Sequence, residues 1–470
     1  MATVRVFNHH VHTSFYWLVL ADMLLFILSL YAGTYIHCMI EADQTNFYTL
    51  LPLIPGRALT FSVSTTVCLF AMGLYEPRMR EGRAGVLLRS LGGFVVASVI
   101  VYSVFIFLPD AELWGEVLVY AVLVAFITNL VTRLTFSNVT DLEQFKNRVL
   151  VYGSGAAAST ISSSMRRKSD RQGFTIVGFV RVEGEEPKVI NERIINLRQP
   201  LAAYAQQIEI DQIVVALDNQ RDQAPTDEFF KCRLQGVKVL NLVNFFEREA
   251  GKILVDFATP GWMTLTEDLR SNVSTSVTKR AFDIFASLGL LGATWPLMLA
   301  TTIAIWLEDG FQSPIFFSQE RIGLGGKAFK VIKFRSMRVD AEGDGKARWA
   351  TKNDSRITRV GAFIRRTRID ELPQIFNVLS GEMSFIGPRP ERPEFVQQLA
   401  EQIPYYNSRH AVKPGITGWA QLCYPYGASE EDARQKLQFD LYYVKNQSLF
   451  LDLMVALSTV EVVVFGKGAR

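Results

Sequence analysis

The chain has 470 residues, of which 49% are hydrophobic and 20% are charged, with a net charge of +3. At roughly 150 residues per domain, this length predicts about three domains. The four cysteines form no CxxC pair, which argues against a disulfide framework and against a cysteine metal site. The small net charge is uninformative because the basic residues are concentrated locally, and no nucleic-acid partner is expected.

Long apolar segments fill most of the first 136 residues, and they lie near 16–40, 57–75, 86–108 and 113–136. Each is close to the roughly 20 residues that cross about 30 Å of hydrocarbon. Residues 1–140 are therefore predicted to form a four-helix transmembrane domain, with no cleavable signal at its start. Asp22 and Arg89 fall inside these segments, and we expect them to lie near helix ends or to face other helices.

The charges of the loops predict the orientation of these helices. The loops at 41–43 and 110–116 are acidic, whereas the loop at 78–83 and the exit from the fourth helix are basic. Basic loops stay on the cytoplasmic side, so the N-terminus and everything after residue 136 are predicted to face the cytoplasm.

Residues 146–265 show alternating strand and helix patterns, which predict a Rossmann-like α/β domain with a parallel sheet. Gly153 and Gly155 follow the first strand and match the GxGxxA dinucleotide pattern. The acidic ribose partner would be Glu183, which comes late, and no Tyr-x-x-x-Lys pair follows. We interpret the domain as structural, regulatory or dimerising, with nucleotide binding as the alternative, and a homodimer would be expected to form through it.

Residues 281–307 look like a fifth transmembrane helix, but Pro296 interrupts them. Proline removes a backbone hydrogen bond and kinks or breaks a helix. The arms on either side reach about 22 Å and about 17 Å, and neither spans about 30 Å. We predict a re-entrant helix over 280–308 that enters the membrane, breaks at Pro296 and returns to the same face. A kinked spanning helix is the alternative.

Basic residues follow this segment in patterns that suit phosphate groups. Lys333 and Arg335 alternate along a predicted strand, so both should point to one face and could bind a diphosphate. A solvated edge strand is the alternative. Arg389 lies between two prolines, and a stiff backbone favours a bidentate contact between guanidinium and phosphate.

Asp370 and Glu371 form an adjacent pair of carboxylates that follows Arg365 and two further arginines. Pro373 predicts that a helix starts at Gln374, so both carboxylates should lie near a helix N-terminus. The arginines should lower the pKa of both carboxyls. An ionised aspartate can attack phosphorus, and Mg²⁺ could bridge a carboxylate and a diphosphate. An ordinary acidic helix cap is the alternative.

Together, these motifs resemble the bacterial sugar transferase family, the monotopic phosphoglycosyl transferases. The resemblance covers residues 275–470 and rests on Lys279-Arg280-x-x-Asp283, the apolar hairpin with its proline, Gln319-Glu320-Arg321-Ile322-Gly323, Lys333-Phe334-Arg335-Ser336-Met337, Asp370-Glu371-Leu372-Pro373-Gln374, Pro388-Arg389-Pro390 and Lys413-Pro414-Gly415-Ile416-Thr417-Gly418. The N-terminal helices and the middle domain resemble the large, exopolysaccharide-initiating branch. One departure is that the family often breaks its hairpin at Ser-Pro, whereas this chain has Trp295-Pro296, so Thr294 would have to supply the hydroxyl.

The resemblance implies transfer of a hexose 1-phosphate from a UDP-sugar to undecaprenyl phosphate, with release of UMP. It implies that Asp370 forms a covalent phosphosugar intermediate and that Glu371 assists with metal or proton. Lys333, Arg335, Arg365 and Arg389 would contact phosphate or uridine. The same resemblance assigns Lys279, Arg280 and Asp283 to anchoring the hairpin and receiving the lipid phosphate.

The expected fold is thus a mixed membrane protein with four transmembrane helices, a Rossmann-like middle domain and an α/β catalytic domain on a re-entrant helix. The expected location is the cytoplasmic face of the bacterial inner membrane. Two other functions stay open at this point: a nucleotide-sugar oxidoreductase or epimerase centred on Gly153 and Gly155, and a non-enzymatic membrane scaffold. The identity of the sugar is not readable from the sequence.

Overall fold

A computed structural model describes the following residues: 3–6, 9–40, 47–48, 50–75, 83–107, 111–140, 146–165, 171, 173–189, 193–218, 224–258, 273–311, 313–338, 356–424, 427 and 429–464. The chain divides into two compact units. One unit is Met1–Val6 with His10–Ala250, and the other is Phe7–His9 with Gly251–Arg470. The basic loop predicted at 78–83 falls almost entirely outside the described residues.

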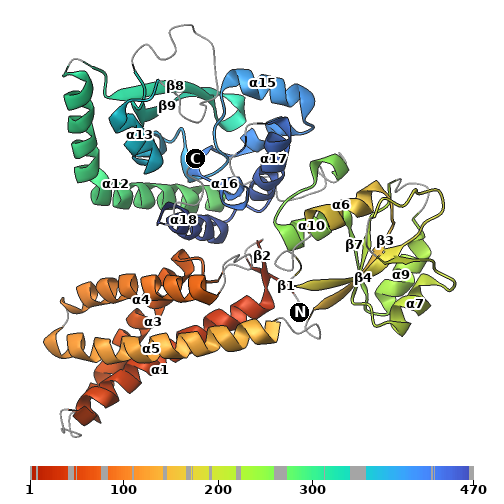
Figure 1. The fold of residues 1–470 in the computed structure, drawn as a ribbon, viewed down its shortest axis with the longest axis horizontal. Coiled ribbons are helices and arrows are strands. Elements are labelled where there is room, and N and C mark those ends of the chain that lie inside the picture. The colour runs from red at the N-terminus through yellow and green to blue at the C-terminus, as the bar shows by residue number, and fades with distance from the viewer. Residues whose placement is uncertain are drawn as a thin grey trace. The chain divides into compact units, whose positions relative to one another are not determined.

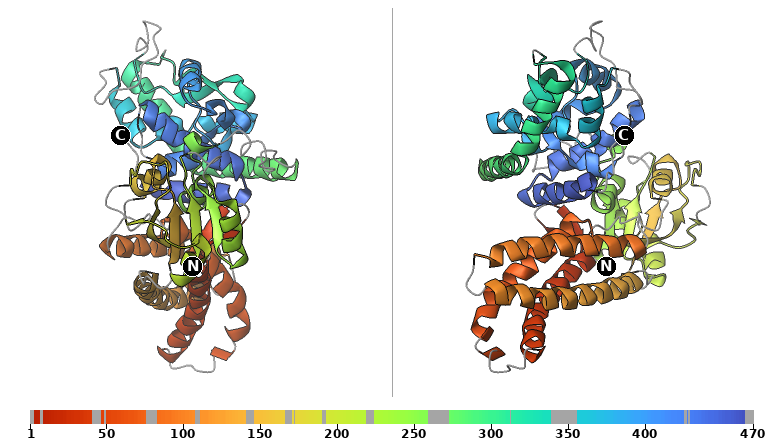
Figure 2. Two further views of the ribbon diagram at one scale, coloured as in Figure 1. Left: turned by 90° about the vertical axis from the view of Figure 1, so that its right-hand side faces the viewer. Right: turned by 60° about the vertical axis from the view of Figure 1, so that its left-hand side comes forward.

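The first unit begins with long apolar helices that gather in a bundle (Figures 1 and 2). They are α1 (Thr13–Ile40), α3 (Ile54–Ala71), α4 (Arg83–Phe105) and α5 (Ala111–Thr140), preceded by the paired strands β1 (Thr3–Val6) and β2 (His9–His12) and by the short η1 (Leu51–Leu53). All four are long and apolar enough to cross a membrane. The second apolar stretch starts at Leu51 rather than at residue 57, because the helix continues through two prolines near its N-terminus, where proline is tolerated.

The charged residues within these helices face other helices, as predicted. The carboxylate of Asp22 is completely buried and accepts hydrogen bonds from the Tyr75 hydroxyl (2.8 Å) and the Arg133 guanidinium (2.9 Å). Arg89 is also buried and donates to the Met72 carbonyl (2.9 Å). These contacts join helices within the bundle, so they fit a structural role better than a transport path.

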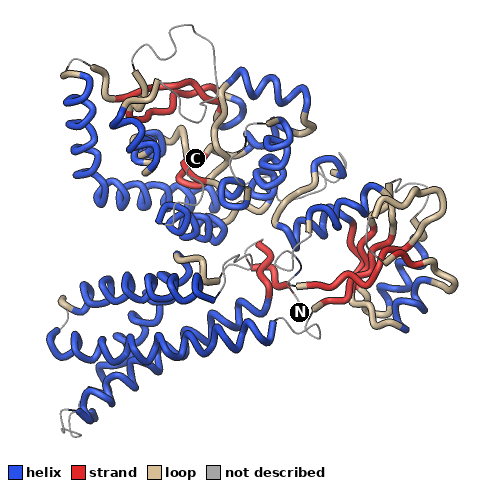
Figure 3. The backbone as a smooth tube through the Cα atoms, viewed as in Figure 1, coloured by secondary structure: helices blue, strands red, loops and turns tan. Residues whose placement is uncertain are grey.

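The first unit also contains a parallel sheet of order β5-β4-β3-β6-β7. Its strands are β3 (Asn147–Tyr152), β4 (Phe174–Val180), β5 (Ile194–Ile195), β6 (Gln212–Val215) and β7 (Lys238–Asn241), and its helices are α6 (Ala156–Ser164), α7 (Leu201–Gln207), α9 (Thr226–Leu234) and α10 (Leu242–Ala250). Figure 3 shows the strands as a red group between helices. Leu150 and Ile213 share a core with α7 and α9, and Phe174 packs against Phe245 of α10. Alternate strand residues therefore bury both faces of the sheet, as expected for parallel strands.

The second unit contains the residues predicted to carry chemistry. Its elements are η4 (Val255–Phe257), α12 (Val273–Asp309), the antiparallel pair β8 (Phe316–Ile322) and β9 (Ala328–Phe334), η6 (Leu324–Gly326), α13 (Arg359–Arg366), η7 (Ile369–Glu371), α14 (Gln374–Ser380), the parallel pair β10 (Ser384–Ile386) and β11 (Gly415–Thr417), α15 (Pro393–Gln402), η8 (Tyr406–Ala411), α16 (Trp419–Cys423), α17 (Glu430–Lys445) and α18 (Leu449–Val464). The segment 251–258, which was predicted to belong to the middle domain, groups with this unit. Its Ile253 amide donates to the Gln438 carbonyl of α17 (2.9 Å).

Helix α12 contains Pro296 and runs as two arms that meet at a sharp bend (Figure 1). In the first arm, Arg280 and Asp283 bond to α14 and β10. In the second arm, Met298 and Ile305 pack in a core with residues of β9, α13 and η7. A straight helix of its 37 residues would be about 55 Å long. The bend instead brings both arms to the same α/β unit.

The hydroxyl expected to support the bend does not act as predicted. Thr294 donates to the carbonyl of Leu290 (2.7 Å), whereas the carbonyl that loses its intrahelical donor to Pro296 is that of Gly292. The Thr294 bond is the ordinary back-bond of a helical threonine to the residue four positions earlier.

Candidate active site

The carboxylate pair lies where the sequence predicted, directly before helix α14. Asp370 and Glu371 occupy the single turn η7, and Pro373 stands immediately before the first residue of α14. The preceding Arg368 has a positive φ of 61°, a left-handed conformation that is uncommon for residues with a Cβ. Such strain persists only where the surrounding structure enforces it, and it is frequent at functional sites.

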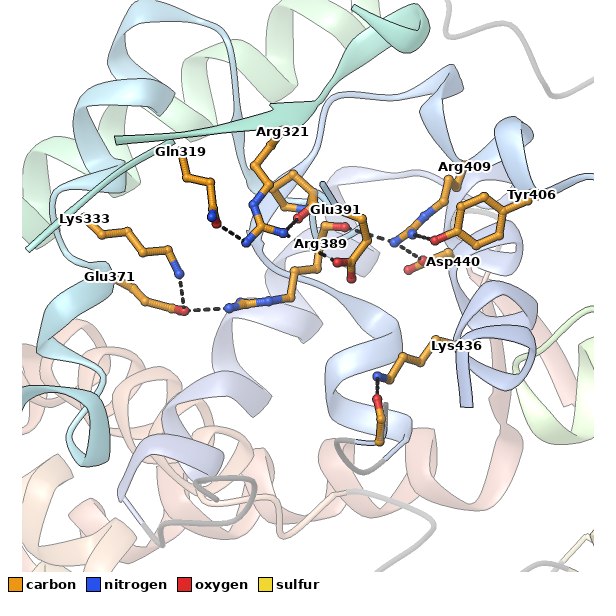
Figure 4. A network of polar contacts seen from close by, with 12 residues as sticks. Gln319, Arg321, Lys333, Glu371, Arg389, Glu391, Tyr406, Arg409, Lys436 and Asp440 are labelled. Atoms are coloured by element: carbon orange, nitrogen blue, oxygen red, sulfur yellow. Dashed lines mark hydrogen bonds and ion pairs between the residues drawn. The ribbon is translucent and has the colours of Figure 1, made fainter. Parts of the chain in front are cut away.

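Glu371 is the centre of a cluster of positive charges (Figure 4). Its Oε1 lies 2.6 Å from Arg389, 3.0 Å from Lys333 and 3.8 Å from Arg368. Its side chain is only 12% exposed. Burial alone would raise the pKa of Glu371, but Arg389 and Lys333 outweigh it and hold that pKa well below its ordinary value. Glu371 is therefore ionised, and the three cations around it outnumber its single negative charge.

Asp370 differs from its neighbour although the two are adjacent. It is 9% exposed, and its Oδ1 has no hydrogen-bond partner within the described part of the chain. Burial, and after it the negative charge of Glu371, raise the pKa of Asp370 above its ordinary value. The prediction that nearby arginines lower both pKa values is wrong for Asp370, because desolvation outweighs Arg365 and Arg368. A buried carboxylate oxygen without a hydrogen-bond donor is costly to keep.

The structure brings together four of the predicted site residues: Asp370, Glu371, Lys333 and Arg389. Burial lowers the pKa of Lys333 despite the opposing effect of Glu371.

Arg335 does not join this cluster. Its guanidinium is 6% exposed and pairs with Asp309 at 2.8 Å, at the last residue of α12. The prediction placed Lys333 and Arg335 on one face of a strand, but β9 ends at Phe334, so Arg335 lies just beyond the strand and pairs with a residue of α12. Its contact in this structure is structural, and the predicted substrate contact stays a prediction.

Lys279, Arg280 and Asp283 fasten the first arm of α12 to the rest of the unit. The Lys279 ammonium contacts Asp452 (2.7 Å), the Tyr443 hydroxyl and the Ile386 carbonyl, which accounts for its three donors. Arg280 donates to the carbonyls of residues 378 and 379 at the C-terminal end of α14, a favourable place for a cation. Asp283 accepts from the hydroxyl of residue 384 and the amide of residue 385. These contacts anchor the helix.

Two carboxylates are too few to hold a metal ion on their own. Among the described residues, no group of three or more His, Cys, Asp or Glu side chains could bind one. Mg²⁺, however, is commonly held by one or two carboxylates together with substrate phosphates and water. The unpartnered oxygen of Asp370, with Glu371 beside it, fits that donor set.

The glycine turn of the middle domain is closed by the chain's own carboxylates. Gly153 has a φ of +126°, and the amides of Ala156 and Ala157 at the start of α6 donate to Asp218 (3.0 and 2.7 Å). A dinucleotide would place its pyrophosphate at this helix N-terminus. Glu185, two positions after the predicted Glu183, accepts hydrogen bonds from the amides of Ser154 and Asp218. Amides of this turn therefore donate to carboxylates of the chain itself.

The sequence did not indicate a buried ion pair that contacts the Arg389 backbone. Arg409 of η8 pairs with Asp440 of α17 at 2.8 Å and donates to the Tyr406 hydroxyl (2.7 Å) and to the Arg389 carbonyl (2.9 Å), as Figure 4 shows. No local motif announces these residues. The only available signal was a pair of charged residues in segments otherwise patterned for burial.

Comparisons with known proteins identify the family of the chain. Residues 274–466 match the model of the bacterial sugar transferase family. The chain is 30% identical over 388 residues to an undecaprenyl-phosphate glucose phosphotransferase of Komagataeibacter xylinus, covering 81% of this chain and 71% of that protein. It is 42% identical over 240 residues to a UDP-N-acetylgalactosamine-undecaprenyl-phosphate N-acetylgalactosaminephosphotransferase of Aeromonas hydrophila, covering 51% of this chain and 55% of that protein.

A further relative is the exopolysaccharide production protein PSS of Rhizobium leguminosarum bv. phaseoli, which is 43% identical over 189 residues. The match covers 39% of this chain and 94% of that protein. The chain thus spans about half of the Aeromonas protein but nearly all of the Rhizobium one. On these matches, the chain belongs to the bacterial sugar transferase family and is a transferase.

Proposed function

We propose that this protein transfers a sugar 1-phosphate from a UDP-sugar to undecaprenyl phosphate and releases UMP, as the first membrane step of exopolysaccharide or capsule synthesis. One observation carries the proposal: Asp370 Oδ1, a buried oxygen without a hydrogen-bond partner among the described residues, adjoins a carboxylate held by three cations. The names of the Komagataeibacter and Aeromonas relatives support undecaprenyl phosphate as the acceptor.

In the first half of the reaction, an oxygen of Asp370 attacks the phosphorus that bears the sugar. The bond from that phosphorus to the bridging oxygen breaks, and UMP leaves with this oxygen. In the second half, a phosphate oxygen of the lipid attacks the same phosphorus, and the carboxylate of Asp370 is released. Each half is one displacement at phosphorus, so the nucleophile is regenerated.

The cations around Glu371 would stabilise the charge of the diphosphate during both displacements. Lys333 and Arg389 are held ready by Glu371, and such preorganised charges contribute strongly to catalysis. Arg365, at the end of α13, adds positive potential. Mg²⁺, when bound by Asp370 and Glu371 with the substrate, would add charge neutralisation at the diphosphate.

The same proposal places α12 in the membrane as a re-entrant helix on the cytoplasmic face of the bacterial inner membrane. Both arms of α12 contact one α/β unit, which supports entry and return on the same side. The UDP-sugar is water-soluble, whereas the lipid phosphate lies at the membrane surface. A helix that dips into the bilayer at Pro296 would hold Asp370 where both substrates are available.

The middle domain is proposed to be a Rossmann-like structural or dimerising module. The oxidoreductase alternative needs an open phosphate site, but Asp218 caps the helix that would provide it. Purified protein should therefore show no absorbance from bound NAD.

The test of the proposed function is release of UMP from UDP-sugar without lipid acceptor. Purified full-length protein should release UMP in an amount equal to the enzyme, and Asp370→Asn should abolish this burst. Asp256→Asn is the matched control, because Asp256 is an exposed carboxylate of the same unit that pairs with Arg434. A normal burst from Asp370→Asn would exclude Asp370 as the nucleophile.

UDP-glucose and UDP-N-acetylgalactosamine are the first donors to compare, because those sugars occur in the names of the relatives. The scaffold alternative predicts that neither donor supports UMP release.

A further inference from the structure

The segment that carries Arg389 is held almost entirely by groups outside it. Pro388 and Pro390 lack amide protons, so the segment has few donors of its own. Its carbonyls are bonded instead, and four in succession accept from elsewhere: Pro388 from the Gly415 amide (3.0 Å), Arg389 from Arg409 (2.9 Å), Pro390 from Arg321 (3.3 Å) and Glu391 from the Ile322 amide (3.0 Å).

Among these donors, Arg409 is a buried side chain with three polar partners. It is 6% exposed, and its guanidinium lies between the Asp440 carboxylate on α17, the Tyr406 hydroxyl on its own turn and the Arg389 carbonyl. Asp440 is buried as well. The planar guanidinium can serve three partners in fixed directions, which an ammonium on a flexible stem cannot do.

A buried ion pair of this kind needs a reason other than stability. Taking two charges out of water is costly, and a well-packed apolar pair is often as stable or more stable. Arg409 of this pair donates to the Arg389 backbone carbonyl, and the Arg389 side chain contacts Glu371 at 2.6 Å. Figure 4 shows this chain of contacts running from Asp440 through Arg409 and Arg389 to Glu371.

We propose that Arg409, oriented by Asp440 and Tyr406, is a positioning residue for Arg389. It touches neither reacting carboxylate in this structure. It fixes the position of the Arg389 backbone. That position determines the distance between the Arg389 guanidinium and the diphosphate bound beside Asp370. The inference rests on the proposed function, because it assigns Arg389 to the diphosphate.

The experiment is a double-mutant cycle on the full-length protein, read by the rate of the UMP burst. Arg409→Lys keeps the charge but cannot reach all three partners, so the rate should fall about 10- to 100-fold, as expected for misplacement by up to about 1 Å. In an Arg389→Ala background, Arg409→Lys should slow the burst by less than about threefold, because the side chain that Arg409 positions has already been removed. The melting temperature of each variant is measured in parallel.

Arg434→Lys is the matched control, since Arg434 lies on α17 and pairs with Asp256 and Glu430, away from the Arg389 segment. It should leave the rate unchanged. Should Arg409→Lys fail to fold, Tyr406→Phe replaces it in the cycle, because it removes one hydrogen bond and keeps the ion pair. It should slow the burst about tenfold, as loss of a hydrogen bond to a charged group does, and by less than about threefold in the Arg389→Ala background.

The possible outcomes separate the two proposals. Multiplicative rate losses in the double variant, or an unchanged burst in Arg409→Lys, would overturn the positioning role while the Asp370-dependent burst of the wild type still supports the proposed function. A wild type without any such burst would overturn both.

Discussion

Replacement of Arg389 by alanine removes the shortest of the three ion pairs around Glu371, at 2.6 Å. Two charges about 4 Å apart near a protein surface interact by about 4 kcal/mol, but the Arg389 side chain is 30% exposed and solvent screens it. Lys333 still faces Glu371 at 3.0 Å. The free energy of unfolding should therefore fall by only about 1–2 kcal/mol, which lowers the melting temperature by roughly 3–6 °C.

The effect on the reaction should be larger than the effect on stability. If Arg389 stabilises the diphosphate, its loss should slow the UMP burst about 10²- to 10³-fold, as loss of a preorganised donor does elsewhere. Arg389→Lys should lose about tenfold, since it keeps the charge without the guanidinium fork. Arg434→Ala, which breaks an ion pair elsewhere in the same unit, should leave the burst intact. A burst within threefold of wild type in Arg389→Ala, alongside the expected loss of stability, would show that Arg389 is structural only.

Other changes test other parts of the chain. Lys279→Met leaves the Asp452 carboxylate buried without its cation, so the protein should lose about 3 kcal/mol, measured by thermal unfolding in detergent. Burial holds the pKa of His410 at about 4 rather than 6.5. Between pH 6.5 and 4 the unfolded state therefore binds more protons than the folded state. The free energy of unfolding should fall by about 3 kcal/mol as the pH falls from 6.5 to 4. His410→Asn should reduce this dependence of stability on pH. Gly155→Ala would place a Cβ 2.2 Å from the Asp218 carboxylate, and loss of this cap should increase hydrogen exchange in α6, whereas an unchanged exchange rate would contradict the capping role.

Local chemistry made part of the site predictable from the sequence. Pro373 correctly indicated the start of α14 and so the position of Asp370 and Glu371 before it. Pro296 predicted a break, and the structure has one bent helix, Val273–Asp309, with Pro296 inside it, so the re-entrant course stays a prediction. Lys333 was found because its position on a strand could be read from alternation.

The rest depended on contacts between distant residues, which no local pattern specifies. Arg335 lies two positions after Lys333 and was expected on the same face of the strand. Its partner Asp309, however, lies 26 positions earlier in the chain. The pKa of Asp370 depends on burial more than on the arginines that precede it. Arg409 and Asp440 have no motif, and only the packing of η8 against α17 brings them together.

A helix that turns back at Pro296 would reach into one leaflet, whereas the four N-terminal helices are long enough to cross both. Total bilayer thickness would therefore act on the two parts of the chain differently, since hydrophobic mismatch applies to segments that span. Thicker or thinner lipids would tilt or compress the N-terminal helices and leave the depth of α12 nearly constant. Under the proposed topology, the height of Asp370 above the headgroups would then follow the composition of the leaflet that α12 enters.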